Sequence, residues 1–122
     1  MKTISISLGS NMDLLKNLQM IANEEDCKGY ILGVVGNLSQ VSFQCPGQLN
    51  SRTLNGNLEI ITLNGTVEPS GLHLHISVSD NNCNVYGGHL EPNTTVLKGV
   101  SILLGFNIDE IKENITIKSL NK

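Results

Sequence analysis

The chain is poor in aromatic residues and in positive charge, and each shortage excludes a class of protein. Among its 122 residues there is no Trp, and there are only two Tyr and two Phe. The core must therefore be built from Leu, Ile and Val, which suit strands. Eight Lys and Arg against eleven Asp and Glu give a net charge of −3, which provides no basic footprint for unaided DNA binding. No apolar run approaches the roughly 18 residues of a membrane-spanning helix.

The cysteines are few as well, and they indicate a reducing environment. Cys27, Cys45 and Cys83 are odd in number and lack C-x-x-C spacing, so we expect neither a disulfide framework nor a zinc ribbon. The first fifteen residues alternate in polarity rather than forming an apolar core, so we expect no signal peptide. These observations predict a single cytoplasmic domain over residues 1–122 with no membrane contact.

Hydrophobic periodicity predicts mostly strands. Apolar alternation or short apolar runs indicate strands at 3–8, 30–36, 38–43, 58–63, 72–79, 85–89 and 96–104. An amphipathic helix is expected after Gly9, because Leu14, Leu18 and Ala22 fall on one helical face, with Ser10 or Asn11 as its cap. We therefore expect an α+β fold: a curved, mostly antiparallel sheet with one main helix packed on it.

The segments between these runs carry turn signals. Residues 45–57 are rich in Asn, Gly, Ser and Gln and predict a loop or ragged hairpin. Asn64-Gly65 predicts a hairpin turn, and residues 91–93 predict a second turn around Pro92. Residues 109–114 predict one helical turn, followed by a final strand through Ile115, Ile117 and Leu120.

The stretch from Gly71 to Leu90 carries the protein's chemistry. His73 and His75 lie on the polar face of one predicted strand, and His89 lies on the strand that returns after an Asn-rich turn. All three histidines therefore fall in one predicted hairpin. Three imidazoles on one face suit zinc or another divalent transition metal, with a further position open to water.

The alternative is that the three histidines bond one another or line a contact between subunits. For a metal site, Ser77, Asp80 and Glu59 are candidate partners that orient the rings. Glu59 is also a weak candidate for a catalytic base, although a structural hydrogen bond is the commoner role of such a carboxylate. We interpret Cys83 as a plain turn thiol, since no cation neighbours it in the sequence.

Four segments in order resemble the PPC domain, which plants and prokaryotes share. They are 9–15 (GSNMDLL), 36–43 (GNLSQVSF), 56–66 (GNLEIITLNGT) and the histidine stretch with its H-L-H, Ser79-Asp80 and G-G-H-L elements. The resemblance implies a curved antiparallel sheet with packed helices, assembled as a homotrimer. In plants this domain follows DNA-binding AT-hooks and mediates self-association and partner binding, and its bacterial relatives are labelled DNA-binding by association.

This sequence departs from the family pattern at three positions. Asn57 and Gln44 stand where arginines are common, so one partner contact and one anion contact are missing. Cys83 replaces a turn glycine, so we expect a neighbouring Asn to take any positive-φ position. No AT-hook is present in the sequence.

Three functions are compatible with these features. The first is a homotrimeric PPC protein with a three-histidine metal site and a DNA-associated or regulatory role that only the resemblance implies. The second is a zinc-dependent hydrolase or lyase acting on a small carbonyl or carboxylate compound, by loose analogy to acetolactate decarboxylases. The third is an assembly domain without chemistry. The sequence alone leaves open whether the protein is an enzyme, because fold does not confer activity.

Overall fold

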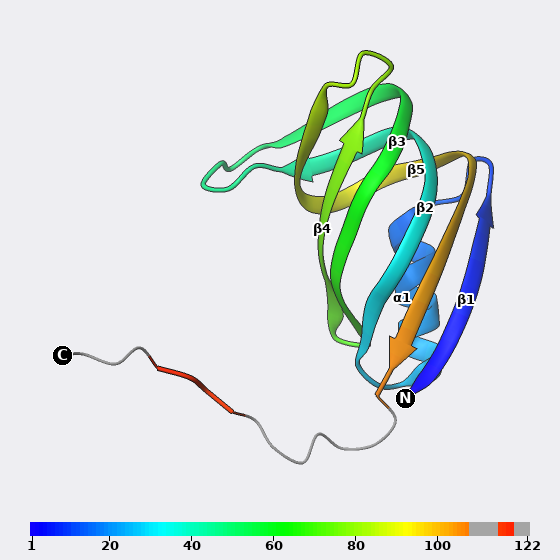
Figure 1. Ribbon diagram of the computed structural model, residues 1–122, viewed down its shortest axis with the longest axis vertical. Coiled ribbons are helices and arrows are strands. Elements are labelled where there is room, and N and C mark those ends of the chain that lie inside the picture. Colours follow the sequence, from blue (N-terminus) through cyan, green and yellow to red (C-terminus); the bar gives the residue numbers. More distant parts are fainter. Residues whose placement is uncertain (108–114, 119–122) are drawn as a thin grey trace.

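Five strands and one helix make up the part of the chain that the computed structural model describes, residues 1–107 and 115–118. In order they are β1 (Lys2–Gly9), α1 (Leu14–Glu25), β2 (Gly29–Gln44), β3 (Ser51–Glu68), β4 (Gly71–Ser79) and β5 (Val85–Phe106). All strand pairings between them are antiparallel. The expected mostly antiparallel sheet with one main helix is confirmed for these residues, and strands dominate it (Figure 1).

The sheet closes on itself at one end. Its order is β1-β5-β2-β3-β4, and β4 pairs a second time with the beginning of β5. Strands β2, β3, β4 and β5 therefore form a ring, while the end of β5 carries β1 along its free side (Figure 1). The ring brings the start of β5 between β2 and β4, where residues far apart in the sequence become neighbours.

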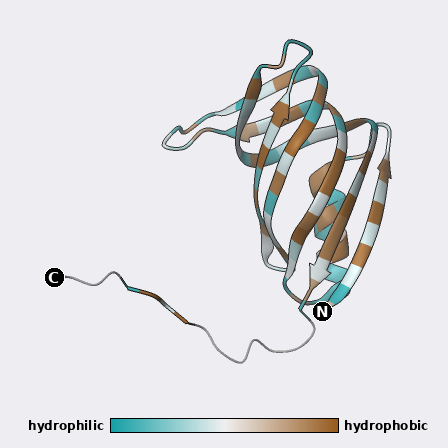
Figure 2. Cartoon of the chain, in the orientation of Figure 1, coloured by the Kyte–Doolittle hydropathy of each residue, from teal (hydrophilic) through white to brown (hydrophobic). Residues whose placement is uncertain are grey.

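The core lies between the sheet and α1. Leu14, Leu18 and Ala22 are fully buried, as the helical stripe predicts, and apolar and polar residues alternate along the strands (Figure 2). The predicted caps are wrong, because Asp13 is the cap and its Oδ1 accepts the N–H of Lys16 at 2.9 Å. Asn11 instead has a φ of 69° and its N–H donates to the carbonyl of Val96.

Two predicted strands, 30–36 and 38–43, are one strand. β2 runs through Gly36 and Asn37 with shifts in its pairing to β5. Gly36 has a φ of +147°, and a Cβ there would collide with the carbonyl oxygen of Gly99. The glycine therefore marks a close crossing of β2 and β5 rather than a chain reversal.

Residues 45–57, predicted as a loop or ragged hairpin, form the end of the β2–β3 hairpin, whereas the turn predicted at Asn64-Gly65 is wrong. β3 begins at Ser51 and continues through both residues, and the chain reverses at Pro69 and Ser70. Gly65 has a φ of +133° and lies opposite Leu74 in β4. A Cβ there would collide with the carbonyl oxygen of His73. This glycine also serves a close strand contact instead of a turn.

The turn predicted at residues 91–93 is a bend inside one strand. β5 passes through Pro92 to Phe106, and Asn93 takes a left-handed conformation with a φ of 70°. The helical turn expected at 109–114 and the residue Leu120 lie outside the described residues. Residues 115–118 are described and form no strand.

Cys83 takes the left-handed position of the β4–β5 turn itself, with a φ of 62°, so the expectation that a neighbouring Asn would do so is wrong. Asp80 holds this turn: its Oδ1 accepts the N–H groups of Asn82 and Asn84, each at 2.9 Å. The N–H of Asn84 is the main cause that lowers the pKa of the exposed Asp80 carboxyl below its ordinary value. These bonds offset the strain of a cysteine in a glycine-like conformation.

Two further features bear on the protein's environment. The three cysteines are free thiols, and Cys83 is exposed while Cys27 and Cys45 are partly buried. Across the described residues, no helix combines the length and the apolar character that a membrane crossing requires.

Replacing Gly65 by Ala should destabilise the protein, because the new Cβ meets backbone atoms that cannot rotate away. We expect a loss of about 2 kcal/mol in the free energy of unfolding, measured by urea denaturation at fixed protein concentration. The control is Gly33→Ala, where nothing lies within 4 Å of an added Cβ and we expect a change below about 1 kcal/mol. Equal effects of the two substitutions would contradict this account of Gly65.

Candidate metal centre

The three histidines lie on the outward face of β4 and β5. In β4 the side chains of Leu74, Ile76 and Val78 are buried, so the intervening His73 and His75 face solvent. His89 of β5 pairs directly with His75 and is partly buried. Paired residues of an antiparallel ladder share a face of the sheet. The sequence prediction that one hairpin presents all three imidazoles on a common face is therefore correct.

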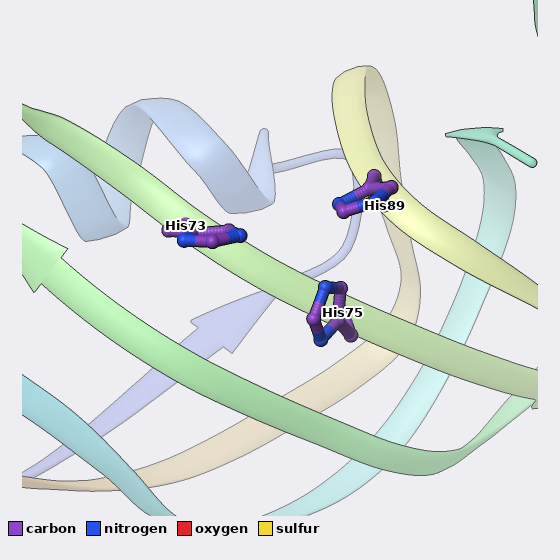
Figure 3. A group of neighbouring side chains, drawn as sticks. All are labelled: His73, His75 and His89. Carbon is purple, nitrogen blue, oxygen red and sulfur yellow. The ribbon is translucent and has the colours of Figure 1, made fainter. Parts of the chain in front are cut away.

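The three rings surround one point (Figure 3). Ring centroids are 5.4 Å apart for His73 and His75, 4.7 Å for His75 and His89, and 6.1 Å for His73 and His89. One candidate ligand nitrogen from each ring lies within 4.8 Å of the others. In the described part of the chain no hydrogen bond engages an imidazole nitrogen. The donor set thus fits a transition metal, since neutral imidazoles are common ligands of such ions.

Gly87 and Gly88 make this meeting of strands possible. A Cβ on Gly87 would collide with the carbonyl oxygen of Ile76 in β4, and one on Gly88 would collide with that of Gln44 in β2. With side chains at these positions β5 could not lie so close to both neighbours. The two glycines therefore fix the strand that carries His89.

The pairing also identifies neighbours of the histidines that the sequence did not reveal. Asn64 and Thr66 of β3 lie opposite His75 and His73, and Gln44 of β2 lies opposite His89. These three side chains are polar and uncharged, and they border the imidazoles on both sides. Asn64 and Thr66 were not predicted as neighbours of the histidines because Asn-Gly indicated a turn there.

In the described part of the chain, none of the three candidate orienting partners bonds an imidazole. Ser77 shares the face of the histidines, but its Oγ lies 2.7 Å from Oγ1 of Thr62. Asp80 holds the turn described above. Glu59 pairs with Ser79, four positions along β4 from His75, which is about 13 Å at the usual rise of a strand. The structure does not bring Glu59 to the imidazoles.

Glu59 instead lines a separate shallow cavity. Gly36, Asn37 and Asn57 form the rest of its wall, and its volume is about 330 Å³. Oδ1 of Asn37 accepts the N–H of Lys98 at 3.0 Å. The cavity lies over β2 and β3, away from the start of β5 that carries His89.

The only arginine of the chain, Arg52, packs on aromatic rings and does not join the histidine cluster. The guanidinium carbon of Arg52 lies 5.7 Å from the ring centre of Phe43 and 5.9 Å from that of Tyr86. Phe43 is buried and Arg52 pairs with it in β2 and β3. Arg52 therefore covers aromatic rings at the edge of the core, on the face opposite to that of the histidines.

Several proteins share this fold. A hypothetical protein from Salmonella cholerae-suis superimposes with a TM-score of 0.84 at 30% identity, covering 86% of this chain and 77% of that chain. A plant- and prokaryote-conserved protein from Pyrococcus horikoshii gives 0.72 at 21% identity, covering 95% and 86%. A metal-containing protein from Archaeoglobus fulgidus gives 0.68 at 19% identity, covering 85% and 78%. The last two likenesses establish the fold alone.

Two further structures, from Bacteroides thetaiotaomicron and Ralstonia eutropha, carry provisional DNA-binding names and match at 21% and 22% identity, which again establishes the fold alone. Their TM-scores are 0.74 and 0.71, and the alignments cover 79% and 77% of those chains.

Curated proteins and a family model match by sequence. The Bifunctional protein GlmU of one Synechococcus strain is 32% identical over 105 residues, which is 85% of this chain and 17% of that protein. The chain thus spans about a sixth of the length of that relative. The model of the Plants and Prokaryotes Conserved (PCC) domain matches residues 1–106. The chain therefore belongs to the PCC domain family, which confirms the PPC resemblance of its four motifs.

Proposed function

We propose that this protein binds a divalent transition metal, with zinc as the first expectation, through His73, His75 and His89. The observation that carries the proposal is the convergence of three ligand nitrogens within 4.8 Å of one another on one face of the sheet. Their freedom from other hydrogen bonds within the described chain supports it. The metal-containing relative from Archaeoglobus fulgidus has the same fold, and this is consistent with the proposal.

The site is suited to holding a small ligand. When bound, the metal would act as a Lewis acid with positions open to water or to an oxygen of a small molecule. The chain supplies neutral ligands and a border of uncharged polar side chains, Asn64, Thr66 and Gln44. We limit the proposal to binding, because Glu59, the weak candidate for a catalytic base, lies about 13 Å along the sheet from His75. A pure assembly domain is the alternative that metal analysis tests.

We extend the proposal to the homotrimer that the family implies. Large apolar side chains remain exposed on the outward face of the sheet: Val35 by 69%, Ile61 by 50%, Leu32 by 48% and Leu103 by 42%. Val35 and Leu103 alternate with buried or partly buried neighbours on β2 and β5 and so face away from the core. Contact with further copies of the chain would remove this apolar surface from water.

In this proposal a DNA-associated or regulatory role acts through a partner. The net charge is −3, and DNA affinity depends on neutralising several phosphates with Lys and Arg. Three copies of an acidic chain would carry more negative charge still. The proposal is compatible with the provisional DNA-binding names of two proteins of this fold only through such a partner. Cytoplasmic localisation belongs to the same proposal.

Protein purified without an affinity tag should contain about one transition-metal ion per chain. His73→Ala and His89→Ala should each lose it, because removing one of three ligands leaves too weak a site. Elemental analysis by mass spectrometry measures the content. Glu59→Gln is the matched control and should retain the metal. Wild-type protein that stays metal-free after incubation with zinc, cobalt or manganese would contradict the metal site and favour the pure assembly domain.

The mass in solution tests the assembly. Light scattering after size exclusion should give three times the mass of the chain, and Val35→Glu should shift it towards that of one chain, since a buried unpaired charge is costly. Met20→Glu is the control, because Met20 is 50% exposed but lies on α1. A wild type with the mass of one chain, or a Val35→Glu variant that keeps the wild-type mass, would contradict the proposed interface.

A gel-shift series over salt concentration tests direct DNA contact. We expect no retardation of duplex DNA even at about 50 mM salt, where phosphate contacts are strong. Retardation that disappears steeply as salt rises would show that the chain binds DNA directly, contrary to our expectation.

A further inference from the structure

Glu91 lies on the same face of β5 as His89. Leu90 between them packs against the core, so its two neighbours point the other way in an extended strand. Pro92 follows directly and restricts Glu91 to extended backbone conformations. Thr94 adds a constraint, because its Oγ1 donates to the carbonyl of Glu91 at 3.0 Å.

Extending the pairing of β4 with β5 beyond its last observed pair, His75 and His89, would place Glu91 at the fourth corner of a square. His75 pairs with His89, and continuing this register by two residues sets His73 opposite Glu91. His73 and His75, which stand two apart on β4, have ring centroids 5.4 Å apart. Glu91 and His89 stand two apart on β5 in the same way.

The fourth corner is wider than the others. Pairing of β4 with β5 ends at His75 and His89, and β5 then bends away (Figure 3) while Glu91 pairs with Ser42 of β2. The Glu91 carboxylate accordingly lies outside the group of three nitrogens. Its side chain has two methylene groups with which to span the gap. In the described part of the chain, that carboxylate has no hydrogen bond or ion pair to hold it elsewhere.

We propose that Glu91 is a fourth protein ligand of the metal, so that the site is a three-histidine, one-glutamate set. This inference rests on the proposed metal binding by the three histidines. A carboxylate oxygen cancels part of the ion's charge, and it broadens the range of suitable metals from zinc towards manganese and iron, which accept oxygen donors readily. It also identifies the carboxylate of the site as one other than Glu59.

The test compares Glu91→Gln with Glu59→Gln and Glu68→Gln. Glu68 of β3 pairs with Gly71, which lies two positions before His73 in β4. It is the strictest control because it is a carboxylate near His73 on the side of that histidine away from Glu91. The affinity for cobalt(II) is measured by competition with a chromophoric chelator, and the absorption spectrum of the bound ion reports its ligands. Glu91→Gln should weaken binding by at least about tenfold and alter the spectrum. The two controls should stay within about twofold of the wild type.

Circular dichroism establishes that each variant is folded, and Glu91→Ala replaces Glu91→Gln if the latter is not. Unchanged affinity and spectrum for a folded Glu91 variant would overturn this inference and leave the three-histidine site intact. Loss of affinity in Glu68→Gln alone would overturn it as well and assign the carboxylate to Glu68. A wild type that binds no cobalt would overturn both proposals together.

Discussion

The register of β4 against β5 is the constraint on which the site depends. His75 and His89 face each other only because the two strands pair in this alignment. A slip of one residue would turn His89 towards the core and Leu90 towards solvent. Gly87 and Gly88 oppose such a slip, because only residues without a Cβ fit between the carbonyl oxygens of the neighbouring strands. The imidazole cluster is therefore a consequence of backbone packing rather than of contacts among the rings.

The two faces of β4 have different roles: the inward face stabilises the fold, and the outward face carries the candidate metal ligands. Its inward side chains, Leu74, Ile76 and Val78, are at most 4% exposed and hold the strand to the core. Its outward histidines contribute little buried apolar surface. Changes to the histidines should thus alter what the protein binds without altering whether it folds. This separation is what makes substitutions at the cluster interpretable as tests of binding.

Local patterns were sufficient to predict most of the secondary structure and the histidine cluster. Strict alternation from Leu72 to Val78 fixed both the strand and the face of each histidine. Where prediction failed, a residue suited to turns was serving another purpose. Gly65 allows a close strand contact, Asn93 allows a bend, and Cys83 adopts a conformation that asparagine was expected to take. A glycine or asparagine in the sequence is equally compatible with a chain reversal and with a close contact between strands. Only the long-range pairing of the strands distinguishes the two.

The site's neighbours were beyond sequence reasoning for the same reason. Gln44 lies opposite His89 only because the closure of four strands into a ring pairs β2 with β5, whereas Asn64 and Thr66 lie opposite His75 and His73 through the β3–β4 pairing. Nothing in their local sequence indicates that closure. The placement of Glu59 away from the cluster likewise depends on register, which composition and spacing do not fix.

The long final strand has a consequence for how the protein acquires its shape. β5 pairs with β1, β2 and β4, and its last residue lies opposite Lys2 at the start of the chain. Most contacts of the sheet thus join residues distant in sequence, a topology that folds slowly. During synthesis, β1 has no sheet partner until residues near 106 have left the ribosome. Until then its unpaired edge is free to pair with other chains.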